Sequence, residues 1–346
     1  MRGAGAGPRR GPTPPPPPPS PWRVRSAAKA GASTRPPPPR AVAALLAAGA
    51  ARERAMDVRG AIAVYERAVA AAPACAEALG AAAKAWSDAI YLDELGVEAL
   101  TPADKAALNE RALVLCRAAA AAAPESGLPH AACCVAAGRL ALVSDNRTKA
   151  RLAVQARADA VASVAKSPDS DLAHHLMGRW HWEMARTPGV VRALARVLYG
   201  AALEPGCHEA ATAHYAKAVA LAPARLIHRV ELGRSLARAG RYEEATSQLN
   251  AALACEVEDV NALLQRADAE IMLSGLRSRT PARAWAGSDD ASNVAAAERE
   301  AGVGGAAGEG GGESLRWAWP APPAPAAFGL RPPPKRRPPP PPLAPA

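Results

Sequence analysis

Small and large hydrophobic residues recur along the middle of the chain at fixed steps. An alanine is followed four residues later by a larger residue, three residues later by a second small residue, and five residues later by a proline. Steps of three and four place the first three side chains on one helical face, and the proline then ends the helix. The sets are Ala61, Tyr65, Ala68 and Pro73; Ala112, Cys116, Ala119 and Pro124; Ala211, Tyr215, Ala218 and Pro223; and, in a weaker form, Ala156, Ala160, Ser163 and Pro168. The pattern predicts four helices that each end just before a proline.

A partner helix is expected in front of these helices, marked by a small residue at the eighth position of the repeat. Gly49, Gly178 and Gly233 occupy this position, and Ala245 is a further candidate packing residue in the last repeat. A small residue lets two helices approach closely while the large residue opposite fills the gap, which is the packing of a tetratricopeptide repeat. The sequence therefore predicts an all-α fold, a tetratricopeptide-like α-solenoid of about five helix pairs over residues 41–275.

The repeats are not evenly spaced. The prolines are separated by 51, 44 and 55 residues (73 to 124, 124 to 168 and 168 to 223), whereas a regular array repeats about every 34 residues. The excess must form loops or longer helices. One insertion contains Thr101-Pro102-Ala103-Asp104, which has the residue types of a capping box at the start of a helix. Another spans about residues 187–207.

The two ends of the chain are rich in proline, glycine and arginine, and we expect residues 1–40 and 276–346 to be disordered flanks. Residues 1–50 hold eight Arg or Lys and no Asp or Glu, within a chain of net charge +10. This basic arm would attract polyanions, and it is either a low-complexity arm or an organelle transit peptide. In the tail, Lys335-Arg336-Arg337 is either a polyanion-binding patch or part of a sequence without function, such as a gene-model artefact.

Other features exclude several classes of protein. The six cysteines form no CxxC motif and indicate reduced thiols inside a cell. No run of residues approaches the roughly 18–20 apolar residues of a transmembrane helix. There is no phosphate loop and no GxSxG motif. We therefore expect neither an enzyme nor a cofactor, catalytic residue, transmembrane segment or nucleic-acid partner.

The segment HHLMGRWHWEMA, residues 174–185, holds three of the seven histidines and two of the seven tryptophans. His174 and His181 share a helical face, so a shared metal ion is conceivable. That face carries no Cys, Asp or Glu at ligand spacing, and HExxH is absent. We therefore favour packing roles for His174, Gly178 and His181 and predict no metal site.

The concave side of such a solenoid is the usual place for a partner. In the register of the repeats, Arg179 and Arg234 occupy equivalent positions, where two guanidinium groups could bind an acidic peptide. In the alternative interpretation, both arginines pair with Glu183 or nearby acids and only solvate the surface. The candidate groove residues are His175, Arg179, Trp182, Arg234 and Arg238.

The segment HHLMGRW, the group Leu198-Tyr199-Gly200 and the helix from Glu209 to Pro223 follow one another as in the regulator of microtubule dynamics family, which this chain resembles over about residues 41–275. The resemblance implies a non-enzymatic scaffold that binds microtubules, tubulin or a microtubule-associated protein in the cytoplasm, including at the spindle. The alternative is an organelle-associated adaptor, mitochondrial or plastid through residues 1–40, that handles lipids at contact sites. Membrane-bound members carry an anchoring helix with no match at the start of this chain.

Overall fold

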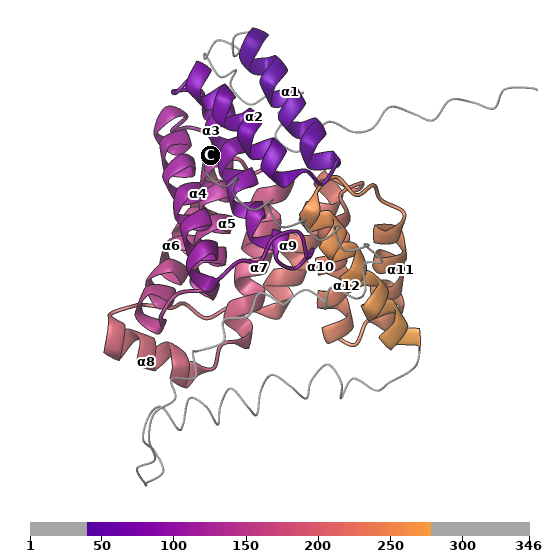
Figure 1. Ribbon diagram of the computed structural model, residues 1–346. Helices are drawn as coiled ribbons and strands as arrows, with labels where there is room; N and C mark the ends of the chain where they lie inside the picture. The colour runs from indigo at the N-terminus through magenta and orange to yellow at the C-terminus, as the bar shows by residue number, and fades with distance from the viewer. Residues whose placement is uncertain (1–39, 278–346) are drawn as a thin grey trace, which may run out of the picture. The chain divides into compact units, whose positions relative to one another are not determined.

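The computed structural model describes residues 40–277, and throughout this range the chain forms helices and no β-strand (Figure 1). The predicted all-α class is confirmed. The arms expected to be disordered lie almost wholly outside the described residues. The elements are α1 (Arg40–Arg54), α2 (Val58–Ala71), α3 (Ala76–Asp88), the 3-10 helix η1 (Ala89–Leu92), α4 (Pro102–Ala122), α5 (Leu128–Leu142), α6 (Asn146–Lys166), α7 (Asp171–Arg186), α8 (Gly189–Tyr199), α9 (His208–Leu221), α10 (Leu226–Arg238), α11 (Tyr242–Leu253) and α12 (Val260–Arg277).

The helices stack as pairs in chain order. The pairs are α1 with α2, α3 with α4, α5 with α6, α7 with α9, and α10 with α11, and α12 packs on the last pair. The second helix of each pair also contacts the first helix of the next pair. This is the tetratricopeptide-like arrangement that the repeat pattern predicts.

Local sequence sets the helix ends. The helices α2, α4, α6 and α9 each stop two residues before a proline. At the start of α4 the Thr101 hydroxyl accepts a hydrogen bond from the Asp104 amide, and the Asp104 carboxylate accepts one from the Thr101 amide. Asp57 and Asp145 cap α2 and α6 in the same way with their carboxylates. The chain therefore turns where caps and prolines direct it.

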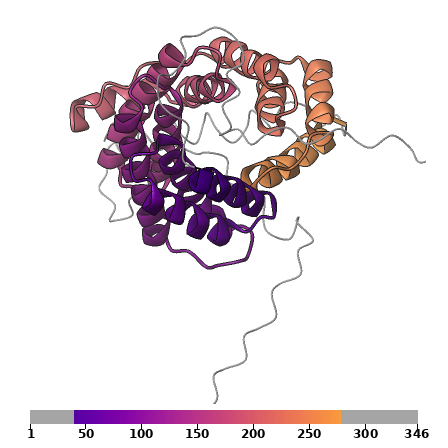
Figure 2. The ribbon, with the colours of Figure 1, turned by 90° about the horizontal axis from the view of Figure 1, so that it is seen from above.

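The helix α8 lies in the second insertion and belongs to no pair. It packs on α6, and both views show it projecting from the stack (Figures 1 and 2). The helix ends at Gly200, whose φ of 68° lies in the left-handed region that glycine adopts readily. The group Leu198-Tyr199-Gly200 is thus the end of an added helix.

Glycines lie where the two helices of a pair come closest. A Cβ atom at Gly49 would stand 2.2 Å from Cε1 of Tyr65, and one at Gly178 would stand 2.9 Å from Cδ1 of Tyr215. A Cβ atom at Gly233 would likewise overlap the large side chain opposite it. The alanines of the repeat pattern are also buried, as is Cys116, the larger residue of its set; these alanines are Ala61, Ala68, Ala112, Ala119, Ala211, Ala218 and Ala245.

Replacing Gly49 by alanine is expected to lower the free energy of unfolding by roughly 1–3 kcal/mol, the usual cost of overpacking a core. The new methyl group would overlap the Tyr65 ring, which is buried and whose hydroxyl donates to Glu53 at 3.0 Å. The ring therefore cannot move aside without losing this hydrogen bond. Urea denaturation of the variant measures the effect.

Helix propensity alone predicts the opposite sign, since alanine is about 1 kcal/mol better than glycine in a helix. The matched control is Ala48→Gly at the exposed neighbouring position, which should cost at most about 1 kcal/mol. A Gly49→Ala protein at least as stable as the wild type would show that the helices do not meet at this point.

The described helices curve round a centre until the last one returns to the first repeats (Figure 2). Asn261, near the start of α12, accepts a hydrogen bond from Arg139 on α5 at 2.7 Å and donates one to Asp88 on α3 at 2.7 Å. The stack is therefore closed by side-chain contacts between its two ends.

Candidate functional site

The first helices of the pairs face one another through charged side chains, and we call this side of the stack, together with α12, the inner face. One group on it, the α7–α10 cluster, consists of Arg179, Glu183, Glu231, Arg234 and Asp268. Arg179 Nη1 donates to Glu231 Oε1 at 2.9 Å, and its Nη2 lies 2.8 Å from Glu183 Oε1. The Arg179 side chain is only 4% exposed, so these pairs are shielded from water.

Glu231 joins the two arginines that the sequence places at equivalent positions. Its Oε2 lies 3.3 Å from Arg234 Nε, and Arg234 Nη2 donates to Asp268 at 2.8 Å. Burial raises the pKa of Glu183 and of Asp268, although Arg179 and Arg234 oppose this effect. The structure thus brings the two guanidinium groups together and pairs them with acids, including the Arg179–Glu183 pair of the alternative interpretation.

The other three candidate groove residues lie in different surroundings. Trp182 is buried among α7, α9 and α10, with its ring edge-on to His208 at 5.1 Å between centroids. Arg238 is exposed, its guanidinium lies 6.0 Å from the centre of the Trp182 ring, and its Nε is 3.0 Å from His208 Nε2. His175 is buried against α10. Of the five, Arg238 is the one that solvent reaches freely.

A second charged group, which we call the closing cluster, joins α1, α3, α5 and the start of α12. Lys84 Nζ lies within 2.8–2.9 Å of carboxylate oxygens of three residues, Glu53, Asp88 and Asp259. Burial acts to lower the pKa of Lys84, but the three carboxylates outweigh it and raise the pKa. Arg139 adds a pair with Asp88 at 2.7 Å.

No pattern in the sequence predicted this cluster. Lys84 is the single cation in the alanine-rich stretch GAAAKAWSDA of α3, which is the one local signal that it has buried partners. Asp88 lies one turn further along the same helix, but Glu53 and Asp259 come from distant parts of the chain, so these two partners could not be read from the sequence.

Two histidine pairs join α7 to its neighbours. In the buried pair, His175 Nδ1 and His228 Nδ1 are 3.0 Å apart, and His228 Nε2 donates to Asp171 at 2.9 Å. With its Nε2 proton directed to Asp171, neutral His228 accepts the Nδ1 proton of His175, so both rings are satisfied without charge. Burial lowers the pKa of both histidines, that of His228 to about 4.

The second pair lies between α7 and α9. His174 Nε2 donates to the Pro168 carbonyl at 2.8 Å, so its Nδ1 accepts from His214 Nδ1 at 3.1 Å. The His181 ring stacks on His214 with 5.7 Å between centroids. Burial, together with His174 and His181, lowers the pKa of His214 to about 4. The two histidines considered for metal binding, His174 and His181, therefore both contact the second helix of their own pair.

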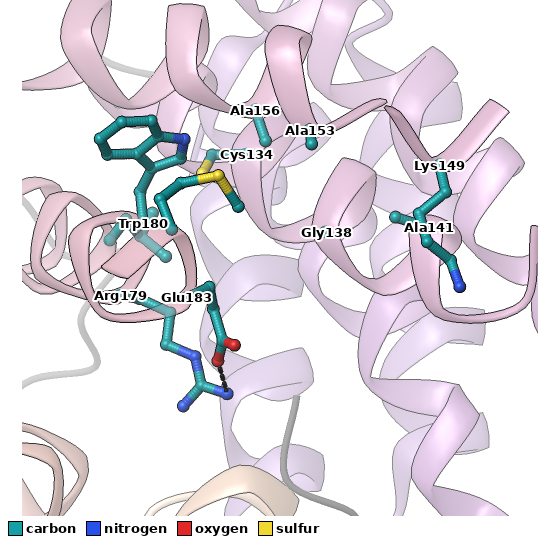
Figure 3. A pocket seen from close by; sticks show the side chains of 11 residues that line it. Cys134, Gly138, Ala141, Lys149, Ala153, Ala156, Arg179, Trp180 and Glu183 are labelled. Carbon is teal, nitrogen blue, oxygen red and sulfur yellow. Dashed lines mark ion pairs between the residues drawn. The ribbon is translucent and has the colours of Figure 1, made fainter. Parts of the chain in front are cut away.

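A small cavity lies between α5, α6 and α7 (Figure 3). Its volume is about 70 Å³, enough for a few water molecules or one small side chain. Figure 3 shows the Arg179–Glu183 pair on one wall and Lys149 apart from it. Burial lowers the pKa of Lys149, with Asp145 opposing. The apolar part of the wall comes from Cys134, Ala141, Ala153, Ala156, Leu176, Trp180 and Met184.

The residues that the structure describes show no arrangement for metal chemistry. Between residues 40 and 277, no group of three or more His, Cys, Asp or Glu side chains could hold a metal ion. All six cysteines lie in this range as free thiols. Within the same range, no helix combines the length and the apolar character needed to cross a bilayer.

The sequence matches the family model of regulator of microtubule dynamics protein 1-3 over residues 45–277. The chain belongs to this family. The match takes in nearly all of the described residues, including both charged clusters and the inserted helix α8. It confirms the resemblance carried by HHLMGRW and the segments after it. No curated protein matches the sequence.

The chain also shows a partial similarity to solved structures of low sequence identity. A thermophilic TPR protein of Thermus thermophilus is 20% identical and aligns with 67% of this chain and 100% of that chain, with a TM-score of 0.45. A human IFIT1 dimer with PPP-AAAA is 15% identical and aligns with 65% of this chain and 51% of that chain, with a TM-score of 0.37.

Proposed function

We propose that this chain is a non-enzymatic scaffold that binds microtubules, or a protein associated with them, through its helical stack. The observation that carries the proposal is the family match over residues 45–277, which reaches from the first helix pair to α12. Stacked helix pairs present long surfaces that suit the binding of other macromolecules. In this proposal the charged clusters hold these surfaces in one arrangement.

Within the candidate groove, Arg238 is the proposed contact for an acidic segment of the partner. It is exposed, and its contacts with Trp182 and His208 hold the guanidinium at the end of α10. In this proposal Arg179 and Arg234 contribute by fixing α7 against α10, because their charges already pair with acids. Reversing the charge of Arg179 would disturb the fold, so Arg238 is the better residue to test.

We expect the full-length chain to co-sediment with taxol-stabilised microtubules. Arg238→Glu should weaken this binding roughly fivefold or more, because a charge-assisted pair becomes a repulsion. The matched control is Arg241→Glu, which makes the same charge change at an exposed arginine that pairs with Glu244 at the start of α11. A wild-type chain that stays in the supernatant refutes the proposal, and equal losses in the two variants refute the role of Arg238.

The basic N-terminal residues could also attract microtubules, so a chain that begins at Arg40 is compared in the same assay. Sedimentation that persists without residues 1–39 assigns binding to the helical stack. Sedimentation that disappears assigns it to the basic arm.

The alternative is an organelle-associated adaptor, which the eight basic and no acidic residues of residues 1–50 favour. Residues 1–40 fused to a fluorescent reporter distinguish the two proposals. Import into mitochondria or plastids supports the adaptor, and a diffuse cytoplasmic signal supports the cytoskeletal scaffold.

A further inference from the structure

The cavity between α5, α6 and α7 lies between two rows of small residues. On α6, Lys149, Ala153 and Ala156 follow one another at steps of four and three, so they share one face of the helix. The facing row on α5 has the same steps and consists of Cys134, Gly138 and Ala141. Apart from Lys149, no side chain in these two rows is larger than that of cysteine, so α5 and α6 leave space between them.

The cavity is apolar at one end and cationic at the other. Lys149 and Ala156 are two helical turns apart, roughly 10 Å along α6. Figure 3 shows Trp180 toward Ala156 and Cys134, and it shows Lys149 toward Ala141. A ligand with one apolar end and one charged end would therefore fit along the rows.

The charges of the lining residues do not cancel. Three of these residues are charged, namely Lys149, Arg179 and Glu183. Arg179 and Glu183 pair with each other at 2.8 Å, so the lining keeps a net positive charge. The Lys149 side chain is buried, and burial lowers the pKa of its ammonium group although Asp145 opposes this effect. A negatively charged ligand group beside Lys149 would stabilise this buried ammonium group.

The size of the cavity limits the apolar part of such a ligand. An engineered apolar cavity of about 150 Å³ takes benzene, and this cavity has about half that volume, about 70 Å³. It therefore accommodates roughly three or four carbon atoms, such as an isopropyl group.

We propose that the cavity binds a short aliphatic carboxylate, with the aliphatic part between Gly138 and Ala153 and the carboxylate at Lys149. This ligand is a free short-chain acid or the C-terminal residue of a protein chain, since both carry a carboxylate next to a small aliphatic group. The site is separate from the proposed contact at Arg238, so it does not depend on microtubule binding.

The test compares small carboxylates with their uncharged amides in ligand-detected NMR titrations of the full-length chain. Isobutyrate represents a free acid, and N-acetylvaline represents a C-terminal residue. We expect at least one of the two to bind roughly fivefold or more tightly than its amide, because the amide cannot form a charge-assisted pair with Lys149. Binding of isobutyrate alone identifies a free acid as the ligand, and binding of N-acetylvaline identifies a protein C-terminus. Octanoate should bind no more tightly than isobutyrate, because its chain exceeds the cavity.

Two variants test whether binding takes place in the cavity. Ala153→Leu fills the cavity and should weaken binding roughly tenfold or more, whereas the matched control Ala158→Leu makes the same change at an exposed position of α6. Lys149→Met should weaken binding of the carboxylates and leave binding of the amides unchanged. Its matched control is Lys166→Met, which removes an exposed lysine from the same helix.

Circular dichroism and thermal unfolding check that the variants keep the fold. Carboxylates that bind the wild type no more tightly than their amides overturn the proposal. Equal effects of the two alanine substitutions would place binding outside the cavity, and equal effects of the two lysine substitutions would mean that net charge alone governs it. Much tighter binding of octanoate would assign the site to long acyl chains. Each of these results also overturns the proposal, and the comparison with octanoate uses the wild type, so it holds even if Ala153→Leu does not fold.

Discussion

Replacing Lys84 by methionine is expected to lower the free energy of unfolding by about 3–5 kcal/mol, the usual cost of removing one partner from a buried ion pair. Lys84 is the cation shared by Glu53, Asp88 and Asp259, and its side chain is only 12% exposed. Methionine fills a similar volume but leaves three carboxylates facing one another, with Arg139 alone to compensate Asp88. Urea denaturation at neutral pH measures the loss.

The matched control is Lys105→Met, which removes a cation that pairs with Asp93 at 2.9 Å near the surface. Surface pairs contribute about 0–1 kcal/mol, so this variant should stay close to the wild type. The loss caused by Lys84→Met should also shrink as the pH falls toward 4, because the unpaired carboxylates then take up protons. Equal effects of the two substitutions would mean that the closing cluster does not hold the ends of the stack.

The wild type is expected to have a higher free energy of unfolding than His228→Gln at pH 7. Lowering the pH from 7 to 4.5 should reduce this difference in the free energy of unfolding by about 2 kcal/mol. The pKa of an unperturbed histidine is about 6.5. Burial lowers the pKa of His228 to about 4 in the folded protein. The unfolded chain therefore binds a proton that the folded protein does not, so the contribution of His228 is fully present above pH 6.5 and is lost as the pH falls toward 4.

Urea denaturation of both proteins at several pH values measures this difference. Glu53 and Glu183, whose pKa values burial raises, act in the opposite direction, but they are present in both proteins and cancel. If His228→Gln does not fold, proton NMR of the wild type gives the same information through imidazole resonances that titrate below pH 5. A stability difference that is independent of pH would exclude a neutral buried pair of His175 and His228.

The helix pairs could be predicted because the residues that pack against each other lie close together in the sequence. Gly49 and Tyr65, or Gly178 and Tyr215, lie on neighbouring helices of one repeat, and the small and large residues recur at helical spacing. The same local signals gave the capping box at Thr101. The family resemblance was also carried by short segments, and in the structure these segments form part of α7, the end of α8 and α9.

The charged clusters could be predicted only where the partners lie one turn apart, as Arg179 and Glu183 do, because the other partners come from distant helices. The register of the repeats placed Arg179 and Arg234 at equivalent positions, and the structure brings both to Glu231. The register could not show that α12 adds Asp268 to this group. Arg179, which the register placed in an open groove, is therefore buried in ion pairs. The insertion that contains α8 could be predicted from the spacing of the prolines. Which apolar side chains of α8 stay exposed depends on how the helix packs against α6, and this could not be predicted.

The hydrogen bond between Asp88 and Asn261 joins residues that are 173 positions apart. An open array of repeats can fray from its ends, since each repeat touches only its neighbours. Here α12 cannot detach without uncovering charges on α3 and α5, so both ends must come apart together. Thermal unfolding should accordingly be a single cooperative transition. The contacts between distant parts of the chain must also form before folding is complete, which slows folding.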